Sequence, residues 1–266
     1  MNKPSFKKLA VVSAAALMMI MTGCGSEAGS AKQTKTFDGK QVQELVIQTE
    51  GQHIEVRPSG NQEIKISMDA NQEIPAALSG DVLSIKLGSS SSVINFKTAK
   101  LQVDLPSKTY RKLSLMTASG QITGEGLQAQ ELQLSSDSGN IEINGYEGNQ
   151  IKGEIVAGNL DLKSVNGGLI LNNDTGHIQI SHKGKMGMES RIKTGSGSVD
   201  LVFENRPAAL QLDVSTESGS IQSSLTSPGD MTSKGAGSQL TAVWGAKEGG
   251  APLLSIRSSS GSIHLK

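Results

Sequence analysis

Acidic side chains recur at regular intervals in the second half of the chain, and their spacing is the strongest chemical signal. Two carboxyl groups about 5–10 Å apart in a groove could hydrolyse a glycosidic bond, and a row of carboxylates could hold Ca²⁺ or a sugar. Asp161 and Asp200 each follow the apolar residue after a glycine. We expect both to point outward on one sheet, in a row with Glu142, Gln179 and His264. A solvated face is the simpler interpretation. The recurring acids are Asp137, Asp161, Asp174, Asp200 and Asp213.

Histidine and cysteine are too sparse to predict a metal site. His177 and His264 take outward positions that Asn, Ser or Gln could equally fill. His177 and His182 are five residues apart, an odd spacing that places them on opposite faces of a strand. The single cysteine, Cys24, excludes a disulfide within the chain and a cysteine-rich metal cage. We therefore expect neither a metal nor a cofactor.

Other catalytic patterns are also missing from the sequence. The Gly195–Ser198 turn has no lysine or helix after it, so it does not predict a phosphate loop. The Ser-Gly pairs have no strand-to-helix elbow, so no serine nucleophile is indicated. Aromatic residues make up only 3% of the chain, and Trp244 is the one candidate for stacking on a sugar, although a cap residue is the simpler interpretation. The sequence predicts a protein that is not an enzyme.

The repeat that carries these residues runs from 113 to 266. It reads apolar, polar, apolar, a few small polar residues, Gly, one polar residue and apolar again. Its glycines are 18 to 22 residues apart, and they are Gly120, Gly139, Gly158, Gly176, Gly197 and Gly219. Gly261 follows 42 residues after the last of these, which predicts about one degenerate unit between them.

The apolar residues before and after each glycine are seven apart, as in Leu134 and Ile141 or Val214 and Ile221. Along one straight strand an odd spacing points two side chains to opposite faces. Both can enter one core only if the chain turns a corner at the glycine. Two short strands per unit of about 20 residues predict a β-solenoid that is similar to a parallel β-helix. An antiparallel β-sandwich remains the alternative.

The N-terminus predicts a targeting signal for export and membrane attachment. Residues 1–23 combine early lysines with a short apolar stretch, as a signal peptide does. They end in Met21, Thr22, Gly23 and Cys24. This run resembles the lipobox of bacterial lipoproteins, which implies a palmitate-type lipid on Cys24 and an anchor on the extracytoplasmic face of the cell membrane. Gly25 resembles the outer-membrane sorting context, if the cell has two membranes. Residues 24–40 predict a flexible tether.

Residues 41–112 alternate less regularly than the repeat, and we expect an N-terminal β region that caps the solenoid of residues 113–266. Leu101–Pro106, Tyr110–Leu115 and Ser119–Ile122 resemble the bacterial putative-adhesin family, a β-strand-repeat domain of unknown function. The resemblance implies an extracytoplasmic β-rich domain, often linked to envelope-stress systems, with no catalytic residues to assign.

The expected function is therefore surface presentation in the cell envelope. With 25 basic and 25 acidic residues the chain has no net charge, and we expect no nucleic-acid partner. We expect a lipid-anchored, non-catalytic scaffold, adhesin-like or accessory to envelope-stress sensing, that meets an envelope protein or a wall polymer. The alternative is a β-helix enzyme that acts on polysaccharides.

Overall fold

The computed structural model describes residues 32–69, 73–88, 99–187, 189–225, 231–234, 236–245 and 250–266. The predicted signal peptide, the lipobox and Cys24 lie outside these residues. Within them, no helix is long and apolar enough to span a bilayer.

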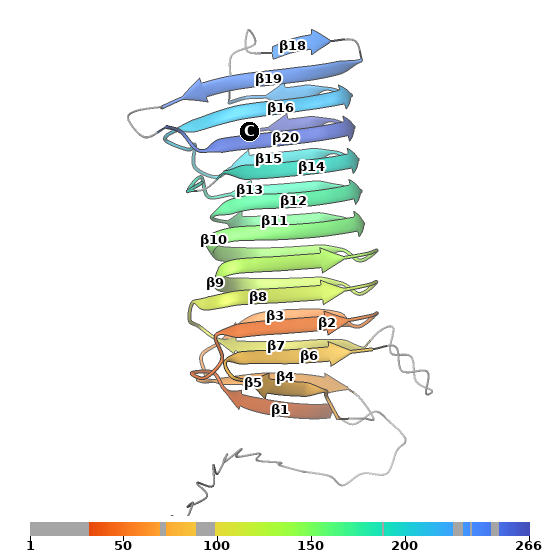
Figure 1. Cartoon of the computed structure of the whole chain (residues 1–266), viewed down its shortest axis with the longest axis vertical. Helices are drawn as coiled ribbons and strands as arrows, with labels where there is room; N and C mark the ends of the chain where they lie inside the picture. The colour runs from red at the N-terminus through yellow and green to blue at the C-terminus, as the bar shows by residue number, and fades with distance from the viewer. Residues whose placement is uncertain are drawn as a thin grey trace, which may run out of the picture.

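The strands form an elongated stack with two faces, joined by long strands that bend from one face to the other (Figure 1). What we call the β2 face contains, in spatial order, β5 (Ala76–Ser79), β6 (Val82–Leu87), β2 (Glu44–Thr49), β8 (Tyr110–Thr117), the ends of β9 (Ile122–Ser136) and β10 (Ile141–Ala157), β12 (Gly168–Thr175), β14 (Ser190–Ser196), β20 (Leu253–Ser260), β16 (Leu210–Ser218), β19 (Gly237–Trp244) and β18 (Met231–Lys234). What we call the β3 face contains β1 (Lys32–Asp38), β4 (Glu63–Asp69), β7 (Lys100–Pro106), β3 (His53–Ser59), the beginnings of β9 and β10, β11 (Leu160–Val165), β13 (Ile178–His182), β15 (Val199–Phe203), β21 (Ile263–Leu265) and β17 (Ile221–Ser223).

Parallel pairing between successive coils makes the fold a β-solenoid, as predicted. Antiparallel pairs occur only toward the two ends of the stack, where β1, β4 and β7 pair at one end and β16, β19 and β18 at the other, with β5 against β6. The antiparallel sandwich considered from sequence is wrong, because residues one repeat apart lie side by side in parallel register, as Leu115 does with Leu134.

The seven-residue spacing brings both apolar positions into one core, as predicted. Leu134 and Ile141 are each 1% exposed, and Val214 and Ile221 belong to the same continuous cluster of buried side chains. The core therefore runs along the whole stack, between the two faces.

Each corner glycine from Gly139 onward lies directly on the glycine of the neighbouring coil, and Gly120 lies on Gln52, which leaves no space for a side chain. A Cβ added to Gly139 would lie 1.7 Å from the Gly120 carbonyl oxygen. The same contact would be 2.4 Å for Gly158 against Gly139, and 2.1 Å for Gly176 against Gly158. Gly176 also has a φ of 127°, which side chains disfavour. The repeated glycine is thus required first by close stacking, and at some coils also by backbone conformation.

A column of buried polar residues runs inside the corners, and all of them except Thr49, which precedes Gln52, lie three positions before a corner glycine. Ser136 Oγ accepts a hydrogen bond from Gly139 N at 2.7 Å and donates to Gly139 O at 2.9 Å. Thr117 Oγ1 accepts from Gly120 N at 2.9 Å. Sequence analysis did not assign these residues, although their constant distance from the glycine was visible. The hydroxyl groups of Ser136 and Thr117 satisfy backbone groups that the corner would otherwise leave unpaired, whereas Thr194 Oγ1 and Ser258 Oγ have no hydrogen-bond partner. The column comprises Thr49, Thr117, Ser136, Asn173, Thr194, Ser258 and Thr216.

The coils do not stack in chain order at the C-terminal end of the solenoid. The coil of β20 and β21 lies between the coil of β14 and β15 and that of β16 and β17. The glycine column shows the same order, because Gly261 lies on Gly197 and Gly219 lies on Gly261. The degenerate repeat expected between Gly219 and Gly261 is therefore wrong: its strands β18 and β19 form an antiparallel extension beyond the last coil.

The N-terminal end has the same arrangement. The coil of β2 and β3 lies between that of β6 and β7 and that of β8 and β9. These are full coils, so the solenoid begins well before residue 113. The tether expected over 24–40 is also too long, because residues 32–38 form β1, paired with β4. Alternating partial burial along β1 explains why so polar a segment is a strand.

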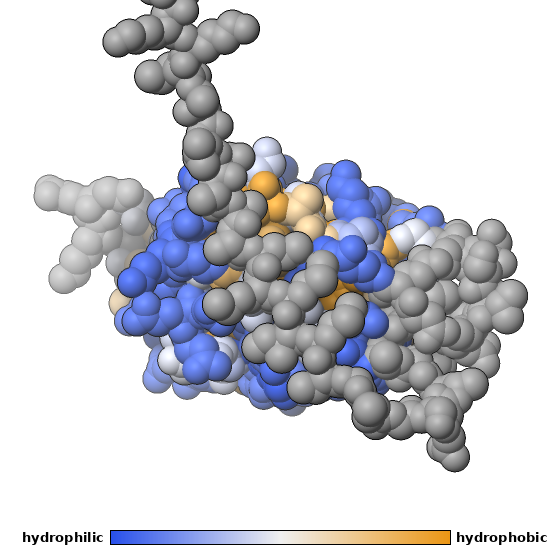
Figure 2. Space-filling view, turned by 90° about the horizontal axis from the view of Figure 1, so that it is seen from below, coloured by the Kyte–Doolittle hydropathy of each residue, from blue (hydrophilic) through white to orange (hydrophobic). Residues whose placement is uncertain are grey.

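The two ends of the stack are covered differently. At the C-terminal end, the half-buried Trp244 packs against the core, donates from Nε1 to Pro207 O at 2.8 Å and lies under Arg206. This places it in the cap, in line with the simpler sequence interpretation. At the N-terminal end, Figure 2 shows a hydrophobic area surrounded by hydrophilic surface. Phe37, Ala76 and Leu78 are the partly buried apolar residues of β1 and β5 that pack against the core there.

His182 is a buried member of the fold, packed edge-on against Phe203 at a ring distance of 5.8 Å. Its Nε2 lies 2.9 Å from Gly167 O, and its Nδ1 accepts from Gly184 N at 2.9 Å. These partners require the neutral ring with the proton on Nε2. Burial also disfavours the charged ring, and it lowers the pKa of His182 below its usual value.

We predict that replacing Gly139 with Ala destabilises the fold by about 1–3 kcal/mol, because the new methyl group would collide with the backbone of the neighbouring coil. Denaturant unfolding measures the change. Gly60→Ala is the matched control, since a Cβ there meets nothing within 4 Å. Equal effects at the two positions would contradict the stacking argument.

We predict that His182 makes the fold less stable below a pH of about 6.5. There the unfolded chain binds a proton that the folded chain, with its lower His182 pKa, does not, so the free energy of unfolding falls by up to about 1.4 kcal/mol per pH unit. Unfolding curves between pH 5 and 8 should show a smaller slope for His182→Gln than for the wild type. An unchanged slope in His182→Gln would contradict this assignment.

Candidate functional site

The β3 face carries a continuous outward row of polar side chains, one from each successive coil. Register places Glu142 beside Asp161, Asp161 beside Gln179, and Asp200 beside His264. The five residues that sequence analysis placed in one row are therefore together. Strands about 4.8 Å apart extend the row over roughly 30 Å. This polar row comprises Glu55, Thr123, Glu142, Asp161, Gln179, Asp200, His264 and Gln222.

Lys163 neutralises part of the polar row. Its Nζ lies 2.8 Å from Glu142 Oε1 and 2.9 Å from Asp161 Oδ2. Hydrogen bonds to these two carboxylates raise the pKa of Lys163, so it stays charged. The adjacent carboxylates are therefore held as an ion-paired group on an accessible face. A hydrolytic pair would need one protonated and one ionised group in a groove, with room for the substrate.

Asp200 connects two histidines from neighbouring coils. Its Oδ2 lies 3.0 Å from His177 Nε2, and its Oδ1 lies 2.5 Å from His264 Nδ1. The other nitrogen of His177 lies 2.7 Å from Ser198 Oγ. Sequence analysis placed His177 and His264 outward but did not foresee that they share one carboxylate. This contact could not be predicted, because it depends on how far neighbouring coils are shifted relative to one another, and only the strand register shows that shift.

A second column of polar residues runs along the outside of the glycine corner, beside the polar row. Asn140 Oδ1 accepts a hydrogen bond from Asn159 N at 2.9 Å, and Asn159 Oδ1 accepts from His177 N at 3.0 Å. Ser220 Oγ and Ser262 Oγ lie 3.1 Å apart, side chain to side chain. The two asparagine side chains therefore hold the backbone of the next coil at the edge of the polar row.

The other sequence candidates do not join this group. Asp213 lies on the β2 face, where it pairs with Arg257. Asp137 and Asp174 lie at the exposed glycine corner. In the ranges that the structure describes, no three His, Cys, Asp or Glu residues are arranged to hold a metal ion.

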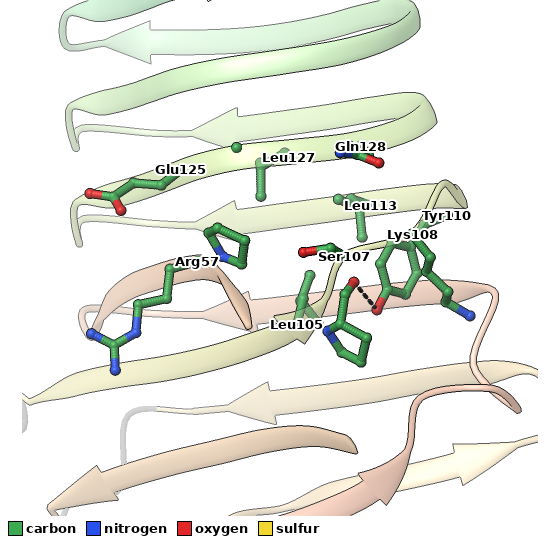
Figure 3. A pocket seen from close by; sticks show the side chains of 12 residues that line it. Arg57, Leu105, Ser107, Lys108, Tyr110, Leu113, Glu125, Leu127 and Gln128 are labelled. Carbon is green, nitrogen blue, oxygen red and sulfur yellow. Dashed lines mark hydrogen bonds between the residues drawn. The ribbon is translucent and has the colours of Figure 1, made fainter. Parts of the chain in front are cut away.

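A shallow depression lies at the opposite corner, between the ends of β3 and β7 and the bend of β9 (Figure 3). Leu105 and Leu127 line it, Arg57 and Glu125 lie toward one side, and Tyr110 lies at the other, donating to Pro106 O at 3.3 Å. It is open to solvent, and its space for the centres of water-sized molecules is only about 10 Å³. Pockets for small organic ligands usually measure about 300–1,000 Å³. We therefore treat the polar row, and not this depression, as the candidate site.

Solved structures with a similar arrangement include three putative adhesion proteins that are distant in sequence. A putative adhesin from Parabacteroides merdae is 12% identical, with a TM-score of 0.47 over 88% of this chain and 96% of that chain. A putative adhesin from Bacteroides fragilis is 14% identical, with a TM-score of 0.42 over 91% and 100%. A putative cell adhesion protein from Clostridium sporogenes is 13% identical, with a TM-score of 0.37 over 89% and 98%.

Among curated proteins, no sequence matches this chain. The family model called Toastrack DUF4097 matches residues 42–266. This match covers both inserted coils and every residue of the polar row, and it confirms the family resemblance drawn from Leu101–Ile122. The chain therefore belongs to the Toastrack DUF4097 family.

Proposed function

We propose that the chain is a non-catalytic, lipid-anchored scaffold of the bacterial cell envelope that binds an envelope protein or a wall polymer through the polar row of its β3 face. The observation that carries the proposal is the continuity of this row, in which register aligns a polar side chain on every coil from Glu55 to Gln222. The rigid core behind it fixes the spacing of these groups.

Charge and order support binding rather than catalysis at this row. The carboxylates of the polar row face outward and already contact Lys163 and two histidines, so the face favours a partner with hydrogen-bond donors. The partner gains affinity from many weak contacts at a repeat of about 4.8 Å. A stress-sensing or adhesive role would use the same face, and the identity of the partner decides between them.

The anchor in this proposal is Cys24, in the run from Met21 to Cys24. Two or three acyl chains on one cysteine give stable membrane attachment, whereas a single chain does not. Residues 24–31 would then connect the lipid to β1, which begins at Lys32.

We predict that Cys24→Ser abolishes incorporation of labelled palmitate and releases the chain from the membrane fraction. Ser119→Cys with Cys24→Ser is the matched control, because it restores a thiol away from the lipobox and should remain unlabelled. Metabolic labelling followed by fractionation is the measurement. Labelling that persists in Cys24→Ser would contradict the anchor.

We predict that Asp161→Lys weakens retention of the envelope partner at least tenfold, since it reverses one charge of the polar row and removes a partner of Lys163. The matched control, Glu154→Lys, makes the same charge change at an exposed position of β10 that belongs to the β2 face. Solubilised envelope is passed over each immobilised protein, and the retained components are quantified. Equal retention by Asp161→Lys and the wild type would exclude the polar row as the binding surface. Thermal melts verify that both variants are folded.

A further inference from the structure

Among the described strands, only those of the C-terminal coil, residues 253–265, pair with both of two parts of the stack that do not pair with each other. On the β2 face, β14 pairs with β12 and β20, whereas β16 pairs with β19 and β20. On the β3 face, β21 lies between β15 and β17 in the same way. Among the described strands, the unit of β16, β17 and β19 thus joins the rest of the solenoid through this coil.

The coil fits its slot on both sides. Gly197 N donates to Ser260 O at 3.0 Å on one side, and Gly261 N donates to Ser218 O at 3.0 Å on the other. Its inward side chains complete the core: Leu254, Ile256 and Ile263 are fully buried and Leu265 is 1% exposed. The slot is therefore a defined binding site for a two-stranded coil with apolar residues at these positions and a glycine at the corner.

Chain order shows that this slot must be open at some stage. Strands β16, β17 and β19 precede the C-terminal coil in the chain, yet they lie on its outer side. The coil must enter between two units, or the outer unit must dock on it afterwards. In either case the incoming coil is covalently attached to its slot only through the connection between Trp244 and Leu253.

We propose that the slot accepts the C-terminal coil of a second copy of this chain, so that two copies exchange residues 253–265 and form a dimer. The exchanged coil makes the same backbone pairs, the same core contacts and the same glycine contact as the chain's own coil. The exchange therefore needs only a change of path after Trp244. It joins two solenoids at the ends formed by β16, β17 and β19, far from β1 (Figure 1). This proposal does not depend on lipid anchoring or on the polar row.

Disulfide trapping tests the exchange in the full chain carrying Cys24→Ser, in detergent. Arg191 and Ser255 are register partners on β14 and β20, both directed outward. Cysteines on adjacent strands have Cα atoms close enough for a disulfide, about 4.4–6.8 Å apart. One copy carries Arg191→Cys and the other carries Ser255→Cys. The two are unfolded, mixed, refolded together and oxidised.

The matched control uses Gln133→Cys in one copy and Lys152→Cys in the other. These residues are also register partners on the β2 face, but β9 and β10 each continue into the next coil and cannot be exchanged alone. We expect a covalent dimer from the Arg191→Cys and Ser255→Cys mixture, at least tenfold more abundant than from the control mixture. No dimer, or equal amounts in both mixtures, would overturn the proposal.

A single chain with both Arg191→Cys and Ser255→Cys verifies the coil order. We expect it to form a disulfide within the chain after refolding at high dilution. Failure to do so in a chain that melts cooperatively would overturn the order of coils on which the exchange depends.

Discussion

The close contact of backbone with backbone at the glycine corner is the constraint on which the rest of the structure depends. At Gly139 the carbonyl oxygen of Gly120 occupies the place of a side chain. This contact allows the chain to turn sharply enough for residues seven apart to enter one core, and it fixes each coil above its neighbour. The hydroxyl groups of residues such as Ser136 then pair with the corner backbone. The outward rows follow from this alignment, because side chains one coil apart can form a row only if every coil turns at the same place.

The sequence predicted the parts of the fold that local periodicity determines. The spacing of Leu134 and Ile141 was enough to predict a corner, a shared core and a stacked architecture, because strand geometry decides on which side each residue lies. The same argument placed Asp161 and Asp200 on one face. It could not find the contact of His177 with Asp200, because that contact depends on the offset between two coils.

Coil order was beyond the sequence for a different physical reason. The last coil carries the same apolar pattern as the others, so its pattern is equally compatible with a place at the end of the stack or inside it. The position of the last coil in the stack depends on which segment can cover the end of the core. The strand of residues 237–244 pairs antiparallel with β16 and brings Trp244 over the core, which makes it a suitable end piece. Strand β1 was missed for the related reason that a polar edge strand has little apolar pattern to detect.

The insertion of residues 253–265 has a consequence for synthesis. A chain on the ribosome can stack its middle coils as they emerge, since each pairs with the one before it. The unit of β16 and β17, however, does not pair with the earlier coils, and its inner side has no partner until β20 and β21, about forty residues further on, have been made. During that interval a nascent chain displays two unpaired strand edges and an open apolar interior, the features that proteases and chaperones recognise. A chain without residues 253–265 would keep this surface exposed, because no other described strand pairs with the facing edges of β14 and β16.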